Sequence, residues 1–178
     1  ACYGKAIANG LPLSVLAGRA RWMEALPSVN YGLTFEAEAV SIAAALETIA
    51  QVRERGVLAT LARMGRRVKS DFEREAASFG VEAVAAGPDA APGFWFAPAA
   101  GLSARELHWL FIQELTRSGV FTLGSFNLCF GHSRSDLDLL ARALREGFRA
   151  VRTAVDRGSS AGLLDGRVRA ALSRVTTP

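Results

Sequence analysis

CYGKAIANGLPLSVLAGR, residues 2–19, places a lysine between a glycine and a run of small apolar residues. Only Lys5 and Lys69 are lysine, and the other nineteen of the 21 basic side chains are arginine. An ordinary lysine has a pKa of about 10.4, so its amine is a nucleophile only where apolar surroundings lower that pKa. The stretch therefore indicates either a reactive amine at Lys5 or an ordinary surface lysine near the chain end.

Composition and length predict a globular protein with a sizeable core. The 178 residues are 50% apolar and 21% charged, which is typical of one domain or slightly more. No apolar run reaches the ~18 residues of a membrane span, and no secretory signal is visible. Cys2, Cys129, His108 and His132 give neither a disulfide framework nor a metal-ligand spacing. We expect a reducing, cytoplasmic setting, with no metal site and no membrane.

The formal net charge of +4 raises the question of a nucleic-acid partner. The arginines recur at helical spacings and are interleaved with acids, as in Arg142, Arg145, Glu146, Arg149 and Arg152. This spacing is typical of a solvated helix face, and no recognised nucleic-acid-binding motif is present. We therefore expect no nucleic acid, and keep polyanion binding by the arginine-rich helices as a lesser hypothesis.

Apolar spacing and turn residues predict the order of the elements. In the first eighty residues they are a loop around Lys5, a buried strand over 13–18, and helices over 21–26, 36–55 and 57–79. Further on they are strands over 81–85, 93–97, 120–123 and 126–130, and helices over 103–118 and 133–158. Gly56, Gly80 and Gly158 are predicted to end helices, while Ser103 and Glu106 form a capping box. After these come a Gly/Ser-rich linker and a weak final helix.

Residues 2–19 closely resemble the active-site segment of class III aminotransferases, which are fold-type I enzymes that use pyridoxal 5'-phosphate (PLP) and include glutamate-1-semialdehyde aminomutase. In that family a lysine is followed by apolar residues, a glycine-rich turn, a proline and a strand. YGLTFEAEAVSIAAAL, residues 31–46, is similar to a family segment in which a threonine precedes an alanine-rich helix. RSGVFTLGSFNLCFGHSRSDLDLLARAL, residues 117–144, resembles the family's C-terminal segment with its strand, histidine and acid-capped helix.

The resemblance implies roles for individual residues. Lys5 falls on the catalytic lysine, which also binds the cofactor as a Schiff base and then moves the proton of the substrate. Thr34 falls on the threonine that, in the family homodimer, reaches across to the cofactor phosphate of the neighbouring subunit. A threonine at this place is also an ordinary helix cap, and both roles can hold at once. His132 and Asp136 match family positions too, although we expect His132 to orient a turn rather than to act in catalysis.

The resemblance implies an α/β fold, namely the C-terminal part of a fold-type I PLP-dependent transferase. We expect residues 1–52 to be the end of the large PLP-binding domain with the start of the linking helix. Residues 53–158 would then be the small C-terminal α/β domain, and residues 159–178 a linker and tail.

In the family, several cofactor-binding segments lie upstream of the catalytic lysine, and this sequence does not show them before Lys5. Members carry a phosphate loop, a ring-stacking aromatic residue and an aspartate for the pyridinium nitrogen upstream of the lysine, but only four residues precede Lys5. We therefore expect the C-terminal half of a PLP-dependent aminotransferase or aminomutase, inactive alone, that acts on a small-molecule amino donor and a carbonyl acceptor. The alternative is a non-catalytic dimerisation module derived from such an enzyme. Asn127 and the Ala8-Asn9-Gly10 stretch depart from aminomutase members, so the substrate stays open.

Overall fold

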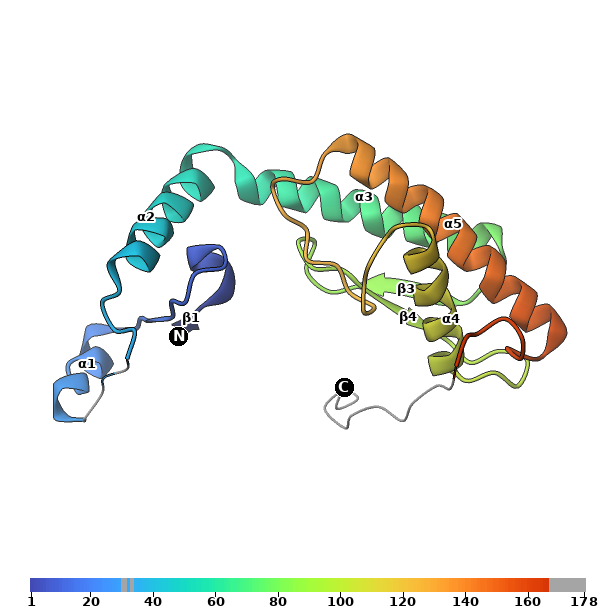
Figure 1. Ribbon diagram of the computed structural model, residues 1–178, viewed down its shortest axis with the longest axis horizontal. Coiled ribbons are helices and arrows are strands. Elements are labelled where there is room, and N and C mark those ends of the chain that lie inside the picture. Colours follow the sequence, from blue (N-terminus) through green and yellow to red (C-terminus); the bar gives the residue numbers. More distant parts are fainter. Residues whose placement is uncertain (30–31, 33, 167–178) are drawn as a thin grey trace. The chain divides into compact units, whose positions relative to one another are not determined.

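The computed structural model describes residues 1–29, 32 and 34–166, and the chain divides into two compact units. Unit 1 comprises residues 1–58 and unit 2 comprises residues 59–178. Each unit has its own elements, which follow the sequence order from blue to red (Figure 1). The predicted domain limits at 52/53 and 158/159 stay predictions.

Unit 1 opens with a small hairpin-like pair of strands around a short helix. Strand β1 (Cys2–Tyr3) pairs antiparallel with β2 (Val15–Leu16), and the 3-10 helix η1 (Lys5–Ala8) lies between them in sequence. The predicted strand over 13–18 is therefore only two residues long, because its partner β1 offers only two residues for pairing. It also differs from the prediction in burial, since Leu16 is 39% exposed.

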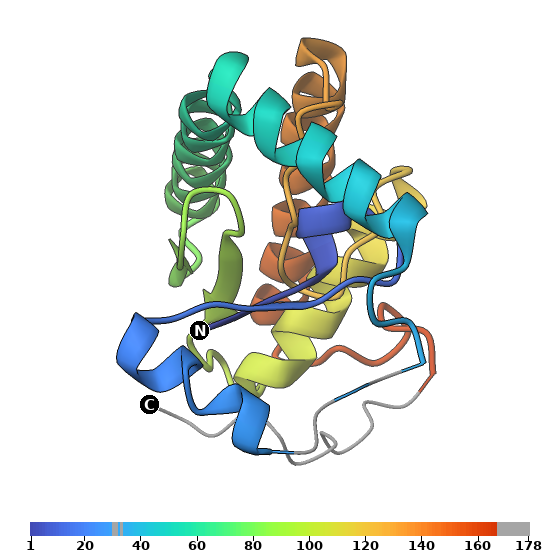
Figure 2. The same cartoon turned by 90° about the vertical axis from the view of Figure 1, so that its left-hand side faces the viewer.

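Three helices complete unit 1. They are α1 (Ala20–Met23), η2 (Leu26–Ser28) and α2 (Ala39–Glu54). Helix α2 lies beside η1 (Figure 2), and the buried residues between them are small: Ala8 on η1, and Ser41 and Ala45 on α2. Gly56, with φ 63°, follows the end of α2, which confirms the predicted break.

Unit 2 packs three helices against a two-stranded sheet. Its elements are α3 (Val57–Ser78, which begins at the boundary), β3 (Ala83–Ala86), β4 (Gly93–Phe96), α4 (Ala104–Arg117) and α5 (Arg134–Arg157). Strands β3 and β4 pair antiparallel, with Ala83 opposite Phe96 and Ala86 opposite Gly93. Phe94 and Phe96 face the helices, whereas Trp95 between them is 52% exposed on the other face, as strand alternation requires.

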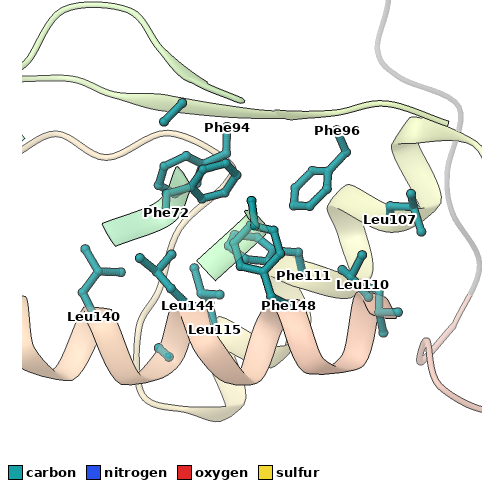
Figure 3. Close-up of a cluster of buried hydrophobic side chains, with 14 of the residues drawn as sticks. Phe72, Phe94, Phe96, Leu107, Leu110, Phe111, Leu115, Leu140, Leu144 and Phe148 are labelled. Atoms are coloured by element: carbon teal, nitrogen blue, oxygen red, sulfur yellow. The ribbon is translucent and has the colours of Figure 1, made fainter. Parts of the chain in front are cut away.

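The core of unit 2 is built around five phenylalanines, two from β4 and one each from α3, α4 and α5 (Figure 3). The rings of Phe72 and Phe94 stack with centroids 4.1 Å apart, Phe111 meets both of them edge-on, and Phe148 meets Phe72 edge-on. Gly147 on α5 lets the ring of Phe111 approach closely, because a Cβ there would lie 2.6 Å from it. The core therefore depends on tight contact between α4 and α5.

The helix ends of unit 2 confirm the sequence signals. Ser103 and Glu106 form the predicted capping box of α4, and Ser133 and Asp136 form one at α5. Gly158 takes the left-handed conformation, φ 61°, as the cap that ends α5. Among the residues that the structure describes, none of the helices is both long and apolar enough to cross a membrane.

The strands predicted over 120–123 and 126–130 are wrong. In the described chain this segment runs beside β4 with single hydrogen bonds, such as Phe94 N to Gly124 O and Phe126 N to Pro92 O, and one isolated bridge. The hydroxyl of Thr122 bonds to the backbone at residues 124 and 125, which closes a turn instead of continuing a ladder.

Residues 159–166, expected to form a linker, lie against α4. The side chain of Gln113 bonds to the carbonyl of Leu163 at 2.8 Å and to the amide of Asp165 at 2.7 Å. The weak helix predicted at the chain end lies outside the described residues.

Candidate functional site

Lys5 is held in an unusual backbone conformation. It is the first residue of η1 and has φ 53°. Of the described residues other than glycine, only Lys5, Asn9, Ala37 and Ala100 have positive φ. For a residue with a Cβ this conformation costs roughly 1–2 kcal/mol, and such outliers cluster at functional sites. The backbone of Lys5 therefore favours a function at this residue independently of any sequence resemblance.

The side chain of Lys5 is exposed in this chain. Within the described residues, no hydrogen bond or ion pair of its amine is found. The apolar enclosure that would keep a lysine amine neutral is therefore not supplied by the part of the chain that the structure describes. Only the backbone of η1 fixes where this side chain starts.

Thr34 lies in the turn that precedes α2 and is exposed. It does not cap the helix, because α2 begins five residues later, at Ala39. Among the described residues, its hydroxyl has no hydrogen-bond partner. The helix-cap alternative for Thr34 is therefore wrong, and its hydroxyl is available to a ligand.

Glu38 is the residue that caps α2. Its carboxylate accepts hydrogen bonds from the amides of Val40, at 2.8 Å, and Ser41, at 2.7 Å. Hydrogen bonds from Ser41 and Val40 hold the pKa of Glu38 below its usual range. The first amides of α2 are therefore engaged by the protein's own carboxylate, and a phosphate near Thr34 would need other donors. Sequence reasoning missed Glu38, because glutamate is not among the preferred capping residues.

A groove of about 960 Å³ lies in unit 1 and includes one of the two predicted site residues. Ile7, two residues after Lys5, and Thr34 both line it, while Lys5 itself does not. The remaining lining is mostly apolar and comes from residues 12–16, Leu26, residues 35–37 and the α2 residues Ile42, Ala45, Leu46 and Ile49. Glu36 is its single ionisable lining side chain among the described residues, so the groove disfavours an anionic group inside it.

The other family-matched residues lie in unit 2 and have structural roles. His132 Nδ1 accepts a hydrogen bond of 3.1 Å from the amide of Cys129, which closes the turn before α5. Asp136 belongs to the α5 capping box, and hydrogen bonds from Ser133 hold the pKa of its carboxylate below the usual range. The interpretation of His132 as an orienting residue is thereby confirmed. The described residues contain no group of three or more side chains suited to hold a metal ion.

Comparisons with known proteins identify the family. The model of aminotransferase class-III matches residues 1–123, and the chain therefore belongs to this family. An aminopentol aminotransferase of Sphingopyxis macrogoltabida is 34% identical over 152 residues, which are 84% of this chain and 35% of that protein. A glutamate-1-semialdehyde 2,1-aminomutase of Caldivirga maquilingensis is 30% identical over 165 residues, 84% of this chain and 38% of that protein.

The solved structures show the same fold. The FumI protein of Sphingopyxis sp. MTA144, in its PLP internal aldimine form, superposes with a TM-score of 0.79 at 27% identity, covering 86% of this chain and 37% of that one. The predicted fold class, the C-terminal part of a fold-type I transferase, is confirmed. The chain thus spans little more than a third of the length of the relatives that it matches.

The residues present suit two chemical groups of PLP. A primary amine at Lys5 suits an aldehyde, and a hydroxyl without a protein partner at Thr34 suits a phosphate oxygen. Both come from unit 1, where Thr34 lines the groove and Lys5 does not. The amine and the hydroxyl therefore match these two groups in kind, while the apolar groove beside Thr34 does not itself favour the phosphate.

Proposed function

We propose that this chain carries the lysine-bearing part of a PLP-dependent aminotransferase site, with Lys5 as its catalytic residue. Lys5 and Thr34 are its cofactor-binding residues. The observation that carries the proposal is the left-handed backbone of Lys5, which lies inside the segment matched by the family model. The names of the relatives support transfer of an amino group between a small-molecule donor and a carbonyl acceptor.

Each residue has a definite task in this proposal. Bound PLP supplies an aldehyde and a conjugated ring that draws electrons from the substrate carbon. The Nζ of Lys5 would hold the cofactor at its aldehyde group, and as a free neutral amine it would take the proton from the α-carbon of the amino donor. The hydroxyl of Thr34 donates a hydrogen bond to a phosphate oxygen, in a homodimer to the cofactor of the neighbouring subunit.

The proposal extends to the setting of the reaction. We place the protein in the cytoplasm, as a homodimer, with either a transferase or a mutase outcome. We also propose that these 178 residues do not turn over substrate by themselves, since the described part of the chain leaves the Lys5 amine exposed.

A titration with PLP tests the assignment of Lys5. The chain and its Lys69→Ala variant are expected to develop the visible absorption band of PLP bound to an amine, and Lys5→Ala is expected to lose it. Lys69 is the matched control because it is the only other lysine and pairs with Asp89 at 2.9 Å in unit 2. An unchanged band in Lys5→Ala would overturn the proposal.

The role of Thr34 needs a separate comparison. Thr34→Val keeps the shape of the side chain and removes the hydroxyl. It is expected to weaken binding of PLP and to leave binding of pyridoxal, which has no phosphate, unchanged. Equal weakening of both ligands would argue against a phosphate contact.

A second candidate function is a non-catalytic dimerisation module. It is favoured by the exposed apolar residues of α2, where Val40 is 64% and Leu46 is 66% exposed. It predicts a stable dimer that does not bind PLP at either lysine. Sedimentation with and without PLP, combined with the absorption titration, separates the two functions.

A further inference from the structure

We infer that Asn9 is a positioning residue that fixes the direction in which Lys5 leaves the backbone, an inference that rests on the proposed function of Lys5. The helix η1 lies between two left-handed residues, Lys5 at its start with φ 53° and Asn9 after its end with φ 50° and ψ 45°. Asparagine adopts this conformation more readily than other residues with a Cβ, because its short polar side chain can bond locally. Asn9 therefore stabilises one end of a turn whose other end is Lys5.

Overlapping hydrogen bonds join the two ends. The amide of Ile7 donates to the carbonyl of Gly4 at 3.3 Å, and the amide of Asn9 donates to that of Ala6 at 3.2 Å. Beyond Asn9, the amide of Leu11 reaches the carbonyl of Ala8 at 3.2 Å. A change of φ at Asn9 redirects the chain that follows it. It therefore breaks the bond between Leu11 and Ala8 and disturbs the return of the chain to β2, whose pairing with β1 closes the loop around Lys5.

Packing on α2 holds the same turn from one side. Ala8, directly before Asn9, is 1% exposed and faces α2, where Ser41 is fully buried and Ala45 is 6% exposed. Ala8 reaches this position only while the turn is closed, because a single 3-10 turn sets the direction of all its side chains together. A closed turn therefore seats Ala8 on α2 and leaves Lys5 free to react.

Among the described residues, no hydrogen bond or ion pair restrains the side chain of Lys5. Its side chain is exposed, so the direction of its Cα–Cβ bond is set by the backbone alone. If the turn opens, Lys5 is free to return to the negative φ that costs less. Its amine then starts from a different direction, and its reactivity falls toward that of a lysine in an unstructured peptide.

The test compares three replacements at Asn9 in the 178-residue chain. Glycine adopts positive φ without cost, whereas the Cβ of alanine destabilises this conformation. Valine destabilises it most, because it is β-branched. The readout is the PLP concentration that gives half-maximal labelling of Lys5 after borohydride reduction, measured by peptide mass. A synthetic peptide of residues 1–18 gives the value without the folded turn, and circular dichroism monitors folding.

Asn9→Gly is expected to reach half-maximal labelling at the same PLP concentration as the wild type, whereas Asn9→Ala is expected to need about fivefold more PLP. Asn9→Val is expected to need nearly as much PLP as the peptide. If the wild type, Asn9→Gly and Asn9→Ala all reached half-maximal labelling at the same PLP concentration, and this lay below the concentration that the peptide needs, the role of Asn9 would be overturned. The proposed function of Lys5 would stay intact. A wild-type chain that labels no better than the peptide would overturn the proposed function itself. Asn9→Ala keeps the test valid if Asn9→Val does not fold.

Discussion

The carboxylate of Glu38 accepts a hydrogen bond of 2.7 Å from the amide of Ser41, and this contact caps the helix that follows the candidate phosphate-binding threonine. Glu38→Ala is expected to expose the first amides of α2 and to lower the thermal midpoint of unit 1 by a few degrees. Hydrogen exchange at Val40 and Ser41 is the measurement. Thr34→Ala is the control, and fast exchange in that variant instead would mean that Thr34 takes part in the cap.

Phe72 lies at the centre of the unit 2 core and is fully buried. Phe72→Ala removes its stacking on Phe94 and leaves a cavity, so we expect a loss of about 3–5 kcal/mol in the free energy of unfolding. Urea unfolding followed by circular dichroism measures it. Phe121, which is 79% exposed, supplies the matched control, and Phe121→Ala should cost less than about 0.5 kcal/mol. Similar losses in both variants would contradict the described core.

Gly65 on α3 makes room for the loop that carries Asp89. A Cβ at Gly65 would overlap the backbone carbonyl of Asp89, so Gly65→Ala must displace this loop or the helix. We expect a destabilisation of about 1–3 kcal/mol in spite of the better helix propensity of alanine. Ser70→Ala, at an exposed position of α3, is the control. A stabilised Gly65→Ala variant would show that the loop does not approach α3 as described.

His108 makes the stability of unit 2 depend on pH. Burial lowers the pKa of His108, and a hydrogen bond with the backbone of Leu123 offsets this only in part. An unfolded histidine has a pKa of about 6.5, so below that pH the unfolded state binds more protons than the folded state. The free energy of unfolding of unit 2 is therefore not reduced by His108 above about pH 6.5. It decreases as the pH falls from there toward the lower pKa of His108 in the folded state.

Urea unfolding at about pH 7 and about pH 5 checks this dependence. His108→Gln is expected to lose less stability between these two pH values than the wild type does, because it lacks the titrating ring. An equal loss in the wild type and His108→Gln would rule out His108 as the source.

The helices were predictable because their signals are local. The capping boxes at Ser103 and Ser133 and the terminal glycines at 56 and 158 each depend on residues within one turn of the helix end. The irregular segment over 120–130 was not predictable, because its apolar residues alternate as in a strand. Such alternation does not exclude a turn that a side chain closes. The hydroxyl of Thr122 bonds to backbone atoms that a ladder would have used.

The roles of the candidate site residues stay predictions, and the geometry of the site could not be predicted from the sequence. Lys5 and Thr34 followed from the resemblance of two segments, and the family match now covers both. No sequence rule predicts a left-handed lysine, since that conformation follows from the closed turn and its packing on α2. The cap formed by Glu38 was likewise hidden, because the helix begins five residues after Thr34.

The central claim is that the amine of Lys5 bonds to the aldehyde of PLP. The most direct measurement is the mass of each peptide after the folded chain has been treated with limiting PLP and borohydride. The pyridoxyl group is expected on the peptide that contains Lys5, at PLP concentrations that leave Lys69 unlabelled. Equal labelling of both lysines, or preference for Lys69, would contradict this claim.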